Sequence, residues 1–208
     1  MQKSKGFTLV ELIVVMAVLL FVVGTAVGIF ISVVQHQGII LYEQELLNQA
    51  SFVLERMSKA LRVAKKESSP ATCLIDSFGV SYPGYNYLLT RYISGVYTGI
   101  KFINQSDDNA CQEFYLDNTD PDNPVLREIK DNGVEVAITS DKLMINSIRF
   151  GINGKTDFGA GDTPAAPGDN DIQPRITIYL DIQTKGVNNQ SVKKIQTTIS
   201  QRDLNAQQ

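Results

Sequence analysis

The chain has 208 residues, of which 43% are hydrophobic and 20% charged, with 19 Lys and Arg against 22 Asp and Glu. This length is enough for one domain with a sizeable core and short for two. The mildly acidic balance excludes the overall basic excess that is typical of proteins whose main partner is nucleic acid.

The first predicted element is a membrane span. From Leu12 to Val34 the chain has 23 residues without an ionisable side chain. At about 1.5 Å per helical residue, this run crosses a hydrocarbon core of about 30 Å. It is too long for the apolar part of a secretory signal peptide, and no A-x-A-like cleavage site follows it. Because Lys3 and Lys5 precede it, the positive-inside rule predicts a cytoplasmic N-terminus and an external remainder.

One carboxylate, Glu11, interrupts the apolar stretch that begins at Phe7. An acidic side chain in a membrane span is costly and requires a partner. A cut between Gly6 and Phe7 would create an α-amino group on Phe7, which is the natural partner. The two groups on one helix allow some self-pairing. In a stack of parallel helices, the amine of one subunit would instead meet Glu11 of its neighbour, which sets the axial register and neutralises both charges.

The sequence Lys-Gly-Phe-Thr-Leu-Val-Glu over residues 5–11, with an apolar run directly behind it, resembles the class III signal of type IV prepilins and type II secretion pseudopilins. The resemblance implies a leader over residues 1–6, cleavage between Gly6 and Phe7 by a prepilin peptidase, methylation of Phe7, and a role for Glu11 in assembly. It implies a structural subunit, not an enzyme.

The same resemblance implies the partners and the location. The partners would be other pilin or pseudopilin subunits, the prepilin peptidase, an inner-membrane assembly platform and membrane lipid, with no nucleic acid. The protein would be a single-pass inner-membrane protein, with its N-terminus in the cytoplasm and its head outside, that enters a cell-surface or periplasmic filament.

A second helical pattern continues the span over residues 35–69. Its apolar residues recur at alternating spacings of four and three, which places them on one stripe of a helix. The stripe consists of Leu46, Ala50, Val53, Met57, Ala60 and Ala64. Because Ser68, Ser69 and Pro70 follow, we expect the helix to end near Lys66.

Short β-like runs separated by turn signals predict a β-rich head over residues 70–202. The expected strands are 72–76, 87–92, 100–103, 113–116, 126–129, 134–138, 144–152, 175–183 and 193–200. The predicted fold class is therefore α+β, with a long N-terminal helix, transmembrane over residues 7–34, packed on an antiparallel sheet. Residues 203–208 form a polar tail.

Both cysteines, Cys73 and Cys111, fall in the part predicted to lie outside the cell membrane. An even pair in an oxidising compartment suggests one disulfide, closing a loop of about 39 residues and contributing roughly 3–4 kcal/mol of stability. Two buried free thiols are the alternative. A zinc site is not expected from two cysteines and one histidine.

The stretch from residue 153 to 173 is rich in Gly and Asp, and oxygen ligands in such a loop suit calcium. The possible ligands are Asp157, Asp162, Asp169 and Asp171. Because the EF-hand spacing is absent, a solvated loop with turn residues is the alternative, and we expect no cofactor.

Looser similarities bear on the type of subunit. The stretches 52–62, 143–150, 173–178 and 195–202 resemble minor pilins and pseudopilins of the W and J types. A major pilin is an alternative. Another is a single-span adhesin or sensor with a β-rich outer domain, whose N-terminus would stay intact. Secretion, DNA uptake, adhesion and motility all remain open as the process served.

Overall fold

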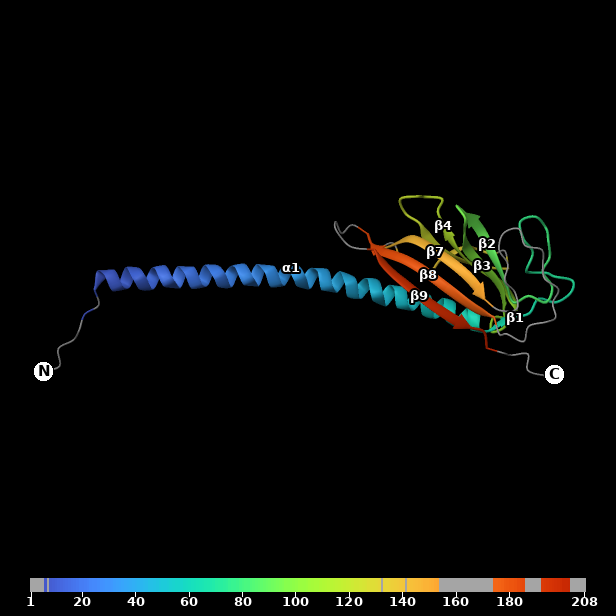
Figure 1. Cartoon of the computed structure of the whole chain (residues 1–208), viewed down its shortest axis with the longest axis horizontal. Helices are drawn as coiled ribbons and strands as arrows, with labels where there is room; N and C mark the ends of the chain where they lie inside the picture. Colours follow the sequence, from blue (N-terminus) through green and yellow to red (C-terminus); the bar gives the residue numbers. More distant parts are fainter. Residues whose placement is uncertain are drawn as a thin grey trace. The chain divides into compact units, whose positions relative to one another are not determined.

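The computed structural model describes residues 6, 8–131, 133–140, 142–153, 174–185 and 192–202. The chain forms two compact units, which meet in sequence between Glu45 and Leu46. The helix α1, Leu9–Arg62, contributes to both units, and antiparallel sheets follow it (Figure 1). The predicted α+β, pilin-like architecture is confirmed.

The second unit, the head, contains two antiparallel sheets. The first sheet has the order β1-β3-β4-β5-β6, with β2 also paired to β3. Its strands are β1 (Ala64–Lys65), β2 (Tyr87–Ile93), β3 (Val96–Asn104), β4 (Ala110–Asp117), β5 (Val125–Lys130) and β6 (Val136–Ala137). The second sheet has the order β7-β8-β9, and its strands are β7 (Leu143–Asn153), β8 (Arg175–Thr184) and β9 (Lys193–Ser200). The alternating inward residues of β7 and β8 make this sheet one wall of the core.

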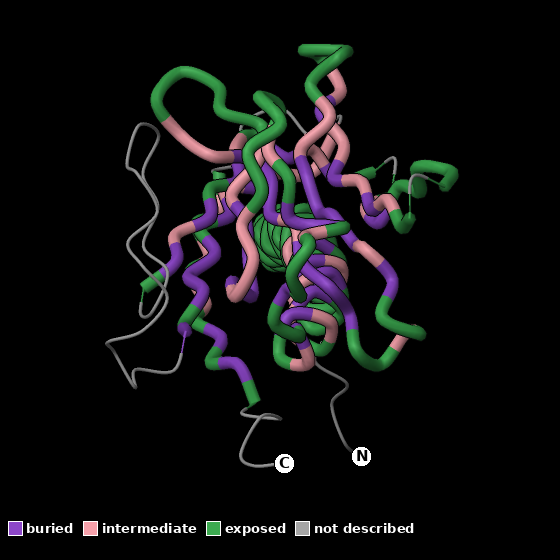
Figure 2. Tube along the Cα trace, turned by 90° about the vertical axis from the view of Figure 1, so that its right-hand side faces the viewer, coloured by how far each residue is buried: buried purple, intermediate pink, exposed green. Residues whose placement is uncertain are grey.

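The core lies between the last part of α1 and both sheets. The buried residues of α1 are Leu46, Ala50, Val53, Met57 and Leu61. They belong to one hydrophobic cluster with inward residues of the first sheet, such as Phe102 and Phe114, and of the second, such as Ile178. The buried stretches of the head follow its strands, purple in Figure 2. The predicted stripe therefore does pack on the sheet, with Leu61 buried and Ala60 only partly so.

A buried polar chain also joins α1 to the first sheet. Glu128 of β5 is 3% exposed. Its carboxylate accepts a hydrogen bond from the Arg56 guanidinium of α1 at 2.5 Å and another from the side-chain amide of Gln112 at 2.6 Å. The Gln112 oxygen in turn accepts from Asn104 at 2.7 Å. Because a buried carboxylate is costly unless it is paired and hydrogen-bonded, this chain favours one docking position of the helix.

The helix ends at Arg62, so the prediction that it continues to about Lys66 is wrong. Ala64 and Lys65 instead pair with β3 as the short strand β1. Tertiary partners also satisfy the helix end: the hydroxyl of the buried Tyr87 donates to the Leu61 carbonyl at 2.6 Å, and burial raises the pKa of that hydroxyl. Free carbonyls at a helix end need such partners.

The predicted strand over residues 72–76 is reduced to an isolated β-bridge between Ile75 and Ser81. This segment instead wraps around the carboxylate of Glu67, which is 4% exposed. The Cys73 and Leu74 amides donate to Glu67 Oε2 at 2.8 and 2.7 Å, in place of a ladder with a neighbouring strand. Burial by itself would raise the pKa of Glu67, but the backbone hydrogen bonds from Leu74 and Cys73, with others, outweigh it and the pKa is lowered.

The remaining predicted strands have counterparts among β2 to β9, although β6 is shorter than expected. Strands β4 and β5 form a hairpin around residues 118–124, because they pair antiparallel and Asp117 lies opposite Val125. The two units meet in sequence between Glu45 and Leu46, and Leu46 is the first buried residue of α1.

The packing of α1 predicts that Met57→Ala destabilises the head. Met57 is 0% exposed, so truncating it leaves a cavity and should lower the free energy of unfolding by about 2–5 kcal/mol. Thermal and denaturant unfolding of the full chain in detergent micelles would measure the change. Phe52→Ala is the matched control, because Phe52 lies on the same helix but is 60% exposed; its effect should stay within about 0.5 kcal/mol. Equal effects of the two variants would contradict this packing.

Candidate functional site

The N-terminal unit exposes a long apolar surface. Every described residue from Thr8 to Gln37 is exposed, including large side chains such as Phe21 at 73% and Phe30 at 67%. Soluble monomers rarely expose apolar patches of this extent, because burying such area is favourable by about 25 cal/mol per Å². By length and composition α1 is able to cross a membrane. This surface therefore requires lipid or other apolar helices around it.

Thr8 caps the start of this helix. The Glu11 amide donates to Thr8 Oγ1 at 3.3 Å, and the Leu12 amide donates to the Thr8 carbonyl at 3.3 Å. Thr8 is thus the N-cap, Leu9 is the first helical residue and Glu11 is the third. The helix begins two residues after Phe7, the residue where we expected it to start.

The spacing of Thr8 and Glu11 follows the capping-box pattern, S/T-x-x-E/Q. In a capping box the threonine oxygen accepts from the third helical amide, which is the bond found here, and the glutamate can return a bond to the N-cap amide. A carboxylate in the first turn is also favoured by the positive end of the helix dipole. Our sequence reasoning missed this local role of Glu11, although the pattern alone predicts it.

Gly6 lies outside the helix and is exposed. A Cβ added to Gly6 would meet no described atom within 4 Å. Packing inside the described part of this chain therefore gives no reason for a glycine at this position.

The described residues bring Gly6, Thr8 and Glu11 into one short segment at the start of α1. Phe7 and residues 1–5 lie outside the described residues, as do the possible calcium ligands Asp157, Asp162, Asp169 and Asp171. Among the residues that the structure does describe, no group of three or more His, Cys, Asp or Glu side chains is arranged to hold a metal ion.

The two cysteines lie in the head, far along the chain from this segment. Cys73 and Cys111 form a disulfide, with their Cα atoms 5.4 Å apart. The disulfide ties the segment around Glu67 to strand β4. Under that segment lies a second, smaller core that includes Leu74, Tyr85 and Leu88.

Comparison with known proteins identifies the N-terminal segment. Residues 1–27 match the family model described as the prokaryotic N-terminal methylation motif. This motif is the signal of type IV pilins and pseudopilins, so the resemblance of residues 5–11 is confirmed. No curated protein and no solved structure matches the chain.

The cap predicts that Thr8→Ala frays the first turn of α1. The change removes the acceptor of the Glu11 amide and should cost about 1 kcal/mol locally, which is roughly a fivefold faster exchange of that amide hydrogen. Hydrogen exchange of the full chain in micelles, followed by NMR, measures this rate. Thr8→Ser keeps the hydroxyl and should preserve protection of the amide. Unchanged exchange in Thr8→Ala would rule out the cap.

Proposed function

We propose that this chain is a structural subunit, a minor pilin or pseudopilin, of a type IV pilus or a type II secretion-like filament. The N-terminal motif marks it as a pilin-like or pseudopilin precursor, and the motif and the apolar helix together indicate a membrane-anchored protein with one span. The observation that carries the proposal is this motif at the start of α1, where the exposed apolar stretch up to Val34 contains a single carboxylate, Glu11.

In this proposal a prepilin peptidase cuts between Gly6 and Phe7 and methylates the new amine of Phe7. The head folds outside the membrane, and the span leaves the bilayer to join parallel helices of neighbouring subunits. The exposed apolar surface of α1 supports this step, because such neighbours bury the same surface that lipid covered before.

Glu11 then has two successive partners. In the single subunit its amide is held by Thr8, and its carboxylate lies at the positive end of the helix dipole. In the filament the carboxylate of one subunit pairs with the Phe7 amine of the next. Because both charges are costly in an apolar environment unless they are paired, the pairing favours one axial position of each incoming subunit.

The placement as a minor subunit rests on the resemblance of residues 52–62 and of the C-terminal stretches to W- and J-type subunits. A major pilin is distinguished from it by copy number in isolated filaments. We propose a structural role without catalysis, with other subunits, the peptidase, the assembly platform and lipid as partners.

The first test is processing of Gly6→Ala. The added methyl group should block the peptidase, so the variant stays at full length when the peptidase is co-expressed. The intact mass of the purified protein should show loss of residues 1–6 and addition of one methyl group in the wild type but not in Gly6→Ala. Gly24→Ala is the control, because Gly24 also has no described neighbour within 4 Å of an added Cβ; it should be cut normally.

Normal cleavage of Gly6→Ala would refute the assigned cleavage site. An intact N-terminus in the wild type would instead favour the single-span adhesin or sensor, which needs no cut.

The second test separates the two roles of Glu11. Glu11→Gln keeps a side chain that can hydrogen-bond at the helix start but removes the charge, whereas Glu11→Ala removes both. If charge pairing drives assembly, both variants are cut normally and both lower the yield of filaments about tenfold or more, as expected for loss of about 1.4 kcal/mol. Filament yield by shearing and immunoblotting measures this. Normal assembly of Glu11→Gln would leave Glu11 with the helix cap alone.

A further inference from the structure

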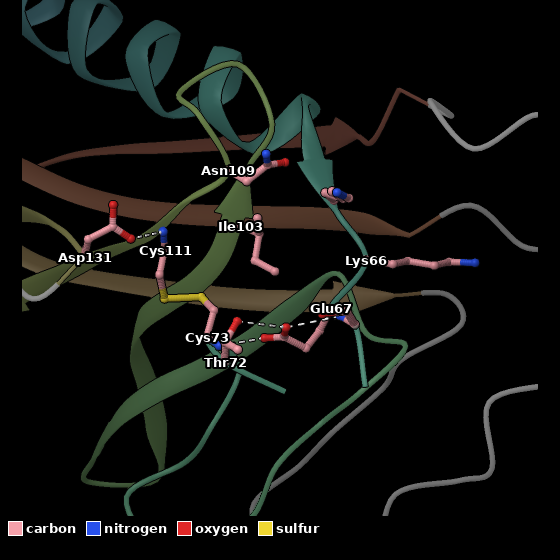
Figure 3. Close-up of a pocket in the computed structure, with 10 residues that line it drawn as sticks. Lys66, Glu67, Thr72, Cys73, Ile103, Asn109, Cys111 and Asp131 are labelled. Carbon is pink, nitrogen blue, oxygen red and sulfur yellow. Dashed lines mark hydrogen bonds between the residues drawn. A yellow bond between two sulfur atoms is a disulfide. The ribbon is translucent and has the colours of Figure 1, made fainter. Parts of the chain in front are cut away.

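The disulfide forms part of the wall of a pocket of about 340 Å³ in the head (Figure 3). The pocket lies between the segment that follows β1 and the turn that follows β5, and both Cys73 and Cys111 line it. Two carboxylates, Glu67 and Asp131, line it as well, one on the side of each half-cystine.

Each half-cystine has its backbone amide held by one of these carboxylates. The Cys73 amide donates to Glu67 Oε2 at 2.8 Å, and the Cys111 amide donates to Asp131 Oδ1 at 2.6 Å. Hydrogen bonds to a charged acceptor are stronger than those between neutral groups. The backbone on both sides of the disulfide is therefore fixed by side chains, independently of the bond between the sulfur atoms.

The path of the backbone explains why a side chain, and not a backbone carbonyl, accepts the hydrogen bond of the Cys111 amide. Strand β5 pairs with β4 up to Lys130, opposite Gln112. Asp131 still donates its own amide to the Cys111 carbonyl at 2.8 Å, but it has a φ of 47° and the chain turns away there. Its carboxylate occupies the place of the carbonyl that a longer β5 would offer to the Cys111 amide.

Glu67 has the same role at Cys73, the other half of the disulfide. Its backbone is tied to the neighbouring segment, because its amide donates to the Tyr85 carbonyl at 2.8 Å and its carbonyl accepts from the Gly84 amide at 2.9 Å. Its carboxylate then accepts from Cys73, Leu74 and Ser68. The segment that carries Cys73 is thereby set against β4 by hydrogen bonds that do not involve sulfur.

We propose that Glu67 and Asp131 are positioning residues for the oxidation of Cys73 and Cys111. They keep the two cysteines close together when the head is reduced. Each thiol is therefore present near the other at a higher effective concentration. The disulfide of a positioned pair is harder to reduce, because breaking it does not release the two chain segments.

The exchange with glutathione balances in two steps. The thiolate of one cysteine attacks glutathione disulfide, forming a mixed disulfide and releasing one glutathione thiolate. The thiolate of the second cysteine attacks the cysteine sulfur of that mixed disulfide and releases the second glutathione. Two electrons pass from the cysteine pair to glutathione disulfide, and the two protons of the cysteine thiols end on the two glutathione molecules. The positioning residues act on the second step, in which the two cysteines must meet.

The test is the equilibrium constant of this exchange, measured with the full chain in detergent micelles over a series of glutathione buffers. Acid quenching, alkylation of free thiols and intact mass give the fraction oxidised. Asp131→Gly removes the acceptor while tolerating the positive φ, so the constant should fall about tenfold. Asp131→Asn keeps an oxygen acceptor at the same place without the charge, so the constant should fall clearly less than in Asp131→Gly.

Two further variants test whether the effect is specific to the carboxylates that hold the cysteine amides. Glu67→Gln replaces one acceptor oxygen by a donor and should also lower the constant, by a route that leaves the turn at Asp131 untouched. Asp120→Gly is the matched control, because Asp120 accepts an amide hydrogen bond in an exposed turn away from the cysteines; it should leave the constant unchanged. Circular dichroism of the oxidised proteins checks that each variant is folded.

A constant for Asp131→Gly equal to that of the wild type would overturn the proposal. So would an equal fall in Asp120→Gly, which would reflect a general loss of stability, or an equal fall in Asp131→Asn, which would assign the effect to charge and not to the hydrogen bond. A fall in Asp131→Gly that is smaller in Asp131→Asn and absent from Asp120→Gly supports it, as does a fall in Glu67→Gln.

Discussion

The apolar, uncharged surface that α1 exposes between Leu12 and Val34 is the constraint on which the rest of the molecule depends. Water does not solvate such a surface favourably, so it has to be covered first by lipid and, in the proposed filament, by other helices. Only one charged side chain, Glu11, interrupts the helix before Val34. Its position at the first turn is tolerable because Thr8 and the helix dipole stabilise that end of α1.

The same helix meets a different environment from Leu46 onward, where one stripe is buried and the other side remains polar. Apolar packing supplies most of the attachment of this part to the sheets. The polar chain from Arg56 through Glu128 to Gln112 adds direction, because hydrogen bonds form only in one register whereas apolar contacts tolerate shifts.

At two places in the head a carboxylate takes the position of a backbone carbonyl where a strand ends. Glu67 and Asp131 both accept amides that no neighbouring strand reaches. This arrangement satisfies the backbone at a sheet edge without adding a strand. It also places fixed acceptors beside both half-cystines, which connects the irregular part of the head to the disulfide.

The sequence by itself determined the features that depend on local pattern. The span follows from composition, the buried stripe from the spacing of Leu46, Ala50, Val53 and Met57, and the signal from residues 5–11. The capping role of Thr8 follows equally from the T-x-x-E spacing of Thr8 and Glu11. Strands such as β8 follow from alternation, because a half-buried strand reads directly in the sequence.

Only the tertiary structure decided the end of α1 at Arg62, the loss of the strand expected at residues 72–76, and the pairing of Asp131 with Cys111. Each depends on a partner outside the segment itself: β3 for Ala64 and Lys65, the Glu67 carboxylate for Cys73 and Leu74, and β4 for Asp131. Local propensity depends only on the residues of the segment itself. A backbone amide, in contrast, donates to whichever acceptor the folded chain places beside it.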